Sequence, residues 1–145
     1  MKILIKTFFF FWEIFQNILG FCFFISFYLR KKIKVSYFEN ERYFIELNSV
    51  GAISLGSFVF YTEKDNSYVP VGLENKNHEY GHSIQSKILG PFYLLTVGLL
   101  SESRLVYAFF YKRIKGKRWP HYYDGFPENW ADKLGKVDKS LRPKA

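Results

Sequence analysis

LENKNHEYGHSIQSKIL, residues 73–89, is the stretch of sequence that decides how this chain folds. Its residues repeat with the period of a helix, and the Gly-Pro pair that follows is a natural helix stop. His78, Glu79 and His82 form an H-E-x-x-H pattern, which on a helix places two imidazoles one turn apart on the same face. The sequence therefore predicts a helix over residues 73–89 that carries a candidate metal site.

The residue types in this pattern are those of a zinc site. Two neutral imidazoles and a third ligand can hold Zn²⁺ and leave one position for water. The metal lowers the pKa of that water toward about 7, and Glu79 can accept its proton during attack on a carbonyl group. Because an apolar stripe that begins at Tyr80 lies on the opposite side of the helix, we expect His78 and His82 to face a cleft.

The third zinc ligand has to come from another part of the chain. Glu128 and Asp132 are spaced i and i+4 in the segment ENWAD, which has the pattern of a short helix starting near Pro127. We predict Glu128 as the third ligand, and Asp132 as the acceptor that fixes the tautomer of a ligand histidine. His121 is an alternative ligand. Asp124 is another, because its Asp-Gly pair is similar to the ligand motif of site-2-type intramembrane proteases.

Aromatic residues lie next to the predicted third ligand. Tyr122 and Tyr123 are close to Glu128 in sequence, so either hydroxyl could donate a hydrogen bond to an oxyanion. They also follow a basic run and Trp119, a composition typical of a membrane interface. The sequence leaves both interpretations open.

The chain begins with a long apolar segment, residues 3–29, which as a helix could cross a bilayer core of about 30 Å. Arg30 and two lysines follow it, in place of a signal-peptide cleavage site. Glu13, Gln16 and Asn17 fall on one side of such a helix, so this side should face protein or a wet cavity. We predict a transmembrane helix, with a backing helix of a soluble domain as the alternative.

Two further patterns occupy the middle of the chain. Residues 34–63 contain three β-branched and aromatic runs, which predict a small three-stranded sheet with a bend or bulge at Gly51 and Gly56. Residues 90–111 form a second apolar run, which residues 101–104 divide into pieces too short to span a membrane. We predict an apolar helical hairpin or re-entrant pair here, or a helix packed on the first one, because each of these keeps the flanking basic clusters on the cytoplasmic face.

Length and composition limit the possible classes of protein. The 145 residues are enough for a single domain, residues 1–145, and 21% aromatic residues exclude an intrinsically disordered chain. A net charge of +8, with a basic tail over residues 112–145, favours contact with membrane lipids, while the lack of a recognition motif argues against nucleic acid. Cys22 is the single cysteine, which excludes an intrachain disulfide.

Together these motifs resemble those of the gluzincin-type metallopeptidases, which carry HExxH on one helix and a glutamate ligand on a later one. HEYGHSIQSKILGPFYLL and ENWADKLGKV are also similar to a group of short bacterial membrane proteins with HEYGHS and ExWADxLG motifs, a resemblance that covers residues 50–137. It implies an α+β fold with a minimal zincin-like core: a backing or transmembrane helix, a small sheet, the HExxH helix, an apolar hairpin and a short glutamate helix.

The function implied by the residues and by this resemblance is that of a zinc metalloendopeptidase acting on peptides or proteins. Polar residues flank the HExxH motif, so we expect the active site at the cytoplasmic surface of the inner membrane and not at its centre. The alternative is a non-catalytic membrane protein with a structural or vestigial zinc site. Structural sites normally have four protein ligands, often cysteines, whereas Cys22 lies in the N-terminal apolar run.

Overall fold

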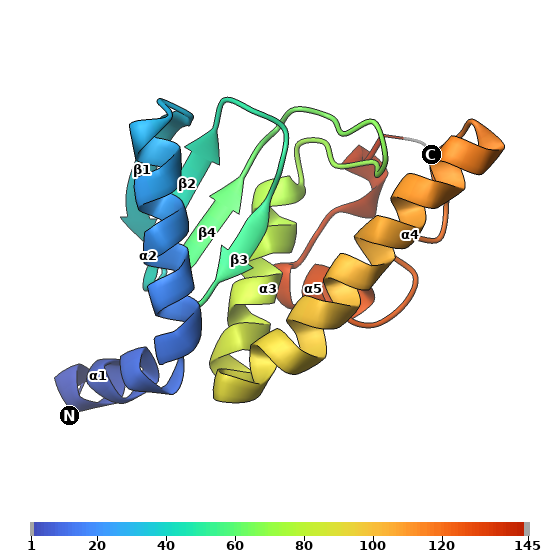
Figure 1. Cartoon of the computed structure of the whole chain (residues 1–145). Coiled ribbons are helices and arrows are strands. Elements are labelled where there is room, and N and C mark those ends of the chain that lie inside the picture. The colour runs from blue at the N-terminus through green and yellow to red at the C-terminus, as the bar shows by residue number, and fades with distance from the viewer. Residues whose placement is uncertain (1, 144–145) are drawn as a thin grey trace.

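The computed structural model describes residues 2–143, without the side chains of residues 2, 3 and 6. Within these residues the fold is α+β, as predicted, with five α-helices and one four-stranded mixed sheet. The α-helices are α1 Lys2–Trp12, α2 Ile14–Leu29, α3 Asn75–Leu89, α4 Leu99–Lys115 and α5 Glu128–Gly135, and the strands are β1 Ile33–Glu39, β2 Arg42–Leu47, β3 Ile53–Leu55 and β4 Phe58–Tyr61 (Figure 1). A 3-10 turn at Gly90–Phe92 and a π-helical turn at Leu94–Gly98 join α3 to α4.

The sheet has one strand more than the sequence predicted. Its order is β1-β2-β4-β3, in which β2 and β4 are parallel and the other pairs antiparallel. The predicted third strand is instead a hairpin, because Gly56 reverses the chain with a left-handed φ of +59°. Asn17 of α2 holds this turn, since its Oδ1 accepts a hydrogen bond from the backbone N–H of Ser57 at 2.8 Å. As a result, β3 becomes an edge strand that packs against α3.

Helices cover both faces of the sheet. Phe44 of β2 belongs to a buried cluster that packs against Tyr80 of α3. The next residue, Ile45, belongs to a second cluster that includes Phe24 and Phe27 of α2. Consecutive side chains of β2 thus pack on opposite faces of the sheet, which is the pattern of a strand buried on both faces. The sheet is therefore the middle layer between α2 and α3.

The N-terminal apolar segment is two helices and not one. α1 and α2 meet at Glu13, whose carboxylate turns inward: its Oε2 lies 3.0 Å and its Oε1 3.3 Å from the guanidinium nitrogens of Arg42. Arg42 also donates to the backbone oxygen of Ser83 in α3 at 2.9 Å, and both charged side chains are buried. Gln16 and Asn17 are buried too, so the polar side of α2 faces protein as predicted.

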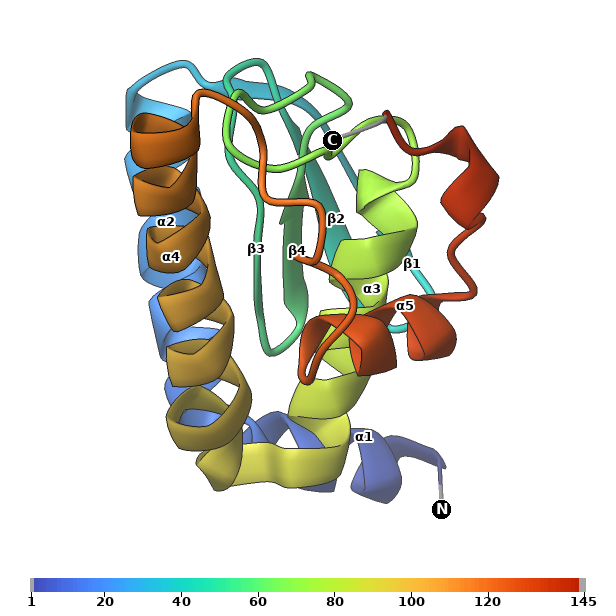
Figure 2. The same ribbon diagram turned by 90° about the vertical axis from the view of Figure 1, so that its right-hand side faces the viewer.

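The second apolar segment is not a hairpin, because its 3-10 and π-helical turns lead into one α-helix, α4. α3 ends at Leu89, and a Cβ on the next residue, Gly90, would lie 2.2 Å from the ring of Trp12. The chain then bends by 115° and continues into α4 (Figure 2). The predicted hairpin over residues 90–111 is wrong, because Ser101 and Arg104 do not interrupt α4. Their side chains instead contact residues 121–128.

α2 and α4 run in the same direction, toward the same end of the molecule (Figures 1 and 2). Basic residues at 30–34 and 112–118 are therefore brought to one end. Among the described residues, no single helix is both long and apolar enough to cross a membrane. The bent pair Asn75–Phe92 and Leu94–Lys115 meets that requirement by length and composition.

Candidate metal centre

α3 and α5 cross with their backbones in contact. Gly81 of α3 and Gly135 of α5 lie at the crossing. A Cβ on Gly81 would be 1.9 Å from the backbone oxygen of Ala131 in α5, and a Cβ on Gly135 would be 1.9 Å from the backbone oxygen of Asn77 in α3. Only glycine, which has no Cβ, permits this approach. The crossing brings the first turn of α5, which begins at Glu128, against the HExxH face of α3.

Three potential metal ligands converge at this crossing, and we call them the His-His-Glu cluster. Nε2 of His78 and Nε2 of His82 are 3.1 Å apart, and Oε2 of Glu128 lies 2.9 Å from the former and 3.3 Å from the latter. All three side chains are buried. Zinc–nitrogen bonds of about 2.0–2.1 Å in a tetrahedron separate the ligand atoms by about 3.3 Å. The cluster thus has the dimensions of a tetrahedral site with one position left.

The outer nitrogens of both imidazoles have partners that fix the tautomers. Nδ1 of His78 lies 2.7 Å from Oδ1 of Asp132, and Nδ1 of His82 lies 2.7 Å from Oε1 of Gln85. Gln85 donates from Nε2 to the backbone oxygen of Pro127 at 2.9 Å, so its oxygen is the atom that faces His82. Because these oxygens accept, we assign the proton to each Nδ1. Both Nε2 lone pairs then point into the cluster, as cation ligands do.

The electrostatics of the cluster also favour a cation. Burial lowers the pKa of His78, but hydrogen bonds to Asp132 and Glu128 outweigh burial and raise this pKa to about 9. With no cation bound, His78 therefore also carries a proton on Nε2 at neutral pH, and a metal ion would replace that proton. Burial likewise opposes ionisation of Glu128, yet the attraction of His82 and His78 holds the pKa of its carboxyl group well below the ordinary value. Glu128 is therefore a carboxylate at neutral pH, the state that metal binding requires.

Glu79 lies beside the cluster without belonging to it. The hydroxyl of Ser54 in β3 is 2.9 Å from Oε2 of Glu79 and 2.6 Å from its backbone oxygen. Tyr93 in turn donates to the backbone oxygen of Ser54 at 3.0 Å. Burial raises the pKa of Glu79 above its ordinary value, against the opposing effect of the two histidines. A carboxylate with a raised pKa is suited to accept and return a proton near neutral pH.

Arg142 fixes the position of Asp132. Arg142 binds it with two hydrogen bonds, at 2.6 Å to Oδ2 and 2.5 Å to Oδ1. The guanidinium carbon of Arg142 lies 3.4 Å from the ring centre of Tyr123, and that ring packs edge-on against His78 at 5.1 Å. Tyr123 thus supports His78 and its partner Asp132 through packing.

Polar residues of α4 hold the segment that carries Glu128. Ser101 donates to Oε1 of Glu128 at 2.6 Å, which leaves Oε2 for the histidines. Arg104 donates to the backbone oxygens of His121 at 2.6 Å and Tyr122 at 2.9 Å. The polar residues 101–104 therefore attach α4 to the candidate site.

The two alternative ligands lie elsewhere. His121 and Asp124 contact each other at the surface, with Nδ1 and Oδ2 2.7 Å apart, and both side chains are more than 60% exposed. Among the described residues, the group of converging ligands contains neither of them. The structure brings His78, His82, Glu128 and Asp132 together and leaves this pair outside.

Two cavities adjoin the cluster. One, of about 160 Å³, lies between β3 and α4 and is lined by Tyr93, Tyr122 and the cluster residues. The other, of about 120 Å³, extends toward Val69 and Val71. Both reach Glu79, and Tyr122 lines both. There is thus unfilled space next to Glu79.

Sequence reasoning missed four residues that support the site. Gln85 is three residues after His82, so helical spacing alone places it near that histidine. Ser101 interrupts an apolar run, a pattern that is typical of a loop as well as of a buried polar partner. Ser54 and Arg142 had no local signal, because their partners Glu79 and Asp132 are brought to them only by the fold.

Comparison with known proteins does not assign the site. No family model matches the chain, and no curated protein or solved structure matches it. The function is therefore inferred from the geometry and chemistry of the residues themselves.

Proposed function

We propose that this protein is a membrane-associated zinc metallopeptidase that hydrolyses bonds in peptides or proteins. The observation that carries the proposal is the convergence of His78 Nε2, His82 Nε2 and Glu128 Oε2 within 2.9–3.3 Å of one another. Two imidazoles and a carboxylate suit zinc, and three protein ligands leave the fourth position open for catalysis. The order of helix, sheet, HExxH helix and glutamate helix supports the resemblance to the gluzincin core.

The residues around the cluster suit the steps of peptide hydrolysis. Bound zinc would supply Lewis acidity and lower the pKa of water toward about 7. Glu79 accepts the proton as the water oxygen attacks the carbonyl carbon, and returns it to the amine nitrogen as the C–N bond breaks. Burial holds the pKa of Tyr122 well above its ordinary value. Its hydroxyl therefore stays protonated and can donate to the oxyanion from the cavity wall.

Metal content tests this proposal directly. We expect the purified chain to bind about one zinc ion per molecule, and His78→Ala, His82→Ala and Glu128→Ala to lose it, because each removes one of three ligands. His121→Ala is the matched control, since it removes an exposed histidine outside the cluster and should keep the metal. Elemental analysis after dialysis gives the ratio. Zinc retained in all three cluster variants would overturn the proposal.

Asp132→Asn is expected to weaken zinc binding by roughly 10- to 100-fold without emptying the site, because it alters the partner that orients His78. Zinc affinity would be measured by competition with a chelator. Asp124→Asn is the control, as its carboxylate is exposed and distant from the cluster. An unchanged affinity in Asp132→Asn would limit Asp132 to a structural role, and a loss larger than that of Glu128→Gln would exchange the roles of the two carboxylates.

Membrane association is the second part of the proposal, and we place the basic clusters at the cytoplasmic side of the inner membrane. Many large apolar residues of the first two helices are exposed, such as Leu4, Phe8, Phe11 and Phe15, at 59–74%. Soluble monomers rarely expose a contiguous apolar surface of this kind. Basic residues gathered at one end fit the positive-inside tendency.

Extraction tests the membrane assignment. We expect the protein to stay in the membrane pellet after washing with high salt and with alkaline carbonate, and to be released by detergent, because apolar contact with lipid survives both washes. Immunoblotting of pellet and supernatant gives the result. Release by carbonate alone would show that the N-terminal helices do not insert.

A further inference from the structure

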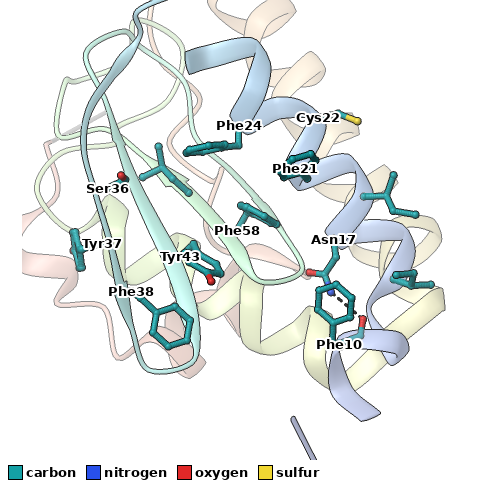
Figure 3. A pocket seen from close by; sticks show the side chains of 13 residues that line it. Phe10, Asn17, Phe21, Cys22, Phe24, Ser36, Tyr37, Phe38, Tyr43 and Phe58 are labelled. Atoms are coloured by element: carbon teal, nitrogen blue, oxygen red, sulfur yellow. Dashed lines mark hydrogen bonds between the residues drawn. The ribbon is translucent and has the colours of Figure 1, made fainter. Parts of the chain in front are cut away.

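A large cavity lies away from the His-His-Glu cluster, on the opposite face of the sheet. α2 packs against β3 and β4, and a groove of about 740 Å³ is left between α1, α2 and the outer face of β1 and β2. This volume is within the range of ligand-binding sites. In Figure 3 the rings of Phe24, Phe58 and Tyr43 stand in the space between the helix and the strands.

The wall of this groove is apolar and largely aromatic. None of the described residues that line it carries a charge. The amide of Asn17 is already occupied, because it donates to the backbone oxygen of Phe10 at 3.0 Å and accepts from Ser57. Phe10, Ile18, Phe38 and Tyr43 along the wall are each about half exposed or more, at 49–59%. The groove therefore favours a hydrocarbon ligand.

The groove continues along α2 and ends among positive charges. A second cavity of about 570 Å³ shares Phe24 and Ser36 with the first and reaches Lys31 at the end of α2. The two cavities lie along α2, whose 16 residues span about 24 Å at 1.5 Å per residue. Arg30 and Lys32 are exposed on either side of Lys31 in sequence. A long apolar channel with cations at one end has the charge pattern of a phospholipid.

We propose that this groove binds one acyl chain of an anionic membrane phospholipid, with the lipid phosphate at Arg30, Lys31 and Lys32. The apolar chain fills the space beside Phe24 and Phe58, where it removes aromatic surface from water. The basic residues add electrostatic attraction to the head group. This lipid site shares with the proposed function only the membrane contact of α1 and α2, and it needs neither zinc nor hydrolysis.

Substitution at Ser36 tests the site. Ser36 is exposed on β1 and lines both cavities, so Ser36→Trp would fill the groove where they join. We expect it to weaken lipid binding about 15-fold, because the exclusion of two methylene groups from the groove weakens binding about fourfold for each group. Val35→Trp is the matched control: it adds the same side chain one residue earlier, at an exposed position that lines neither cavity, and should bind lipid normally.

The measurement is native mass spectrometry of the detergent-purified chain, titrated with dioleoyl phosphatidylglycerol or dioleoyl phosphatidylcholine. We expect one tightly bound phosphatidylglycerol, preferred over phosphatidylcholine by about fivefold for each basic residue that contacts it. The triple variant Arg30→Gln, Lys31→Gln, Lys32→Gln should lose this preference and keep the apolar binding. Thermal unfolding checks that the variants are folded.

Three results would overturn the lipid site. The first is equal lipid binding by wild type and Ser36→Trp. The second is equal binding of the two lipids by wild type, which would remove the phosphate contact. The third is a dimer that Ser36→Trp abolishes, which would show that a second copy of the chain occupies the groove. Zinc content is independent of all three, so failure of the lipid site and failure of the peptidase proposal can be told apart.

Discussion

Glu79→Gln should lower the rate of peptide hydrolysis by on the order of 10²–10⁴-fold while zinc stays bound, which is the loss expected when a general base is removed. Glutamine has nearly the same shape as glutamate, and its amide can still bond to the hydroxyl of Ser54. It cannot accept the proton of the attacking water. Since Glu79 is beside the ligands and not one of them, the His-His-Glu cluster remains complete.

The assay compares wild type and Glu79→Gln on fluorescent casein and on a mixed peptide library read by mass spectrometry. Zinc content measured on the same samples separates loss of chemistry from loss of metal. Wild-type protein that holds zinc and cleaves no peptide would favour the non-catalytic alternative, in which the metal is structural or vestigial. Equal cleavage by both proteins would remove Glu79 from the mechanism.

Gly81→Ala should disrupt the metal centre without touching a ligand. The new Cβ would lie 1.9 Å from the backbone oxygen of Ala131, so α5 has to move away by more than 1 Å. Overpacking of this kind costs about 1–3 kcal/mol or more. Because metal sites require ligand distances within about 0.2 Å, displacement of Glu128 should greatly weaken zinc binding.

Gly98→Ala is the control for this substitution. At that position the nearest atom to a new Cβ is 3.8 Å away, so the change should be neutral or slightly stabilising. Gly135→Ala should reproduce the effect of Gly81→Ala, because its new Cβ would clash with the backbone oxygen of Asn77 in α3. Zinc affinity and urea unfolding are the measurements. If Gly81→Ala behaves like Gly98→Ala in both, the close crossing of α3 and α5 does not hold the site together.

The sequence was informative where a feature depends on neighbours in the chain. The helix around His78 and the helix that begins at Glu128 were predictable, because helical periodicity, Pro127 and Gly90 are local signals. The α+β class followed from the change of period after residue 33. Local spacing also put Asp132 one turn from Glu128, although only the fold brings either of them to α3.

Features that depend on contacts between distant residues were not predicted, or were predicted wrongly. The fourth strand exists because the chain turns at Gly56, which lies against Asn17. Asn17 accepts a hydrogen bond from Ser57 in this turn, although the two residues are forty positions apart in the sequence. Residues 101–104 were interpreted as a break in a hairpin, since nothing in the sequence pairs Ser101 with Glu128. A polar residue in an apolar run can mark a loop or a buried partner, and the pattern alone does not distinguish the two.

The buried pair of Glu13 and Arg42 has a practical consequence for the production of a water-soluble fragment. Deleting residues 2–29 would remove the counter-charge of Arg42, whose guanidinium also donates to the backbone oxygen of Ser83. Breaking a buried pair from one side costs about 3–5 kcal/mol, a large part of the stability of an ordinary domain. The first two helices are therefore not a detachable anchor. A soluble version has to keep them and replace exposed side chains such as Phe11 with polar ones.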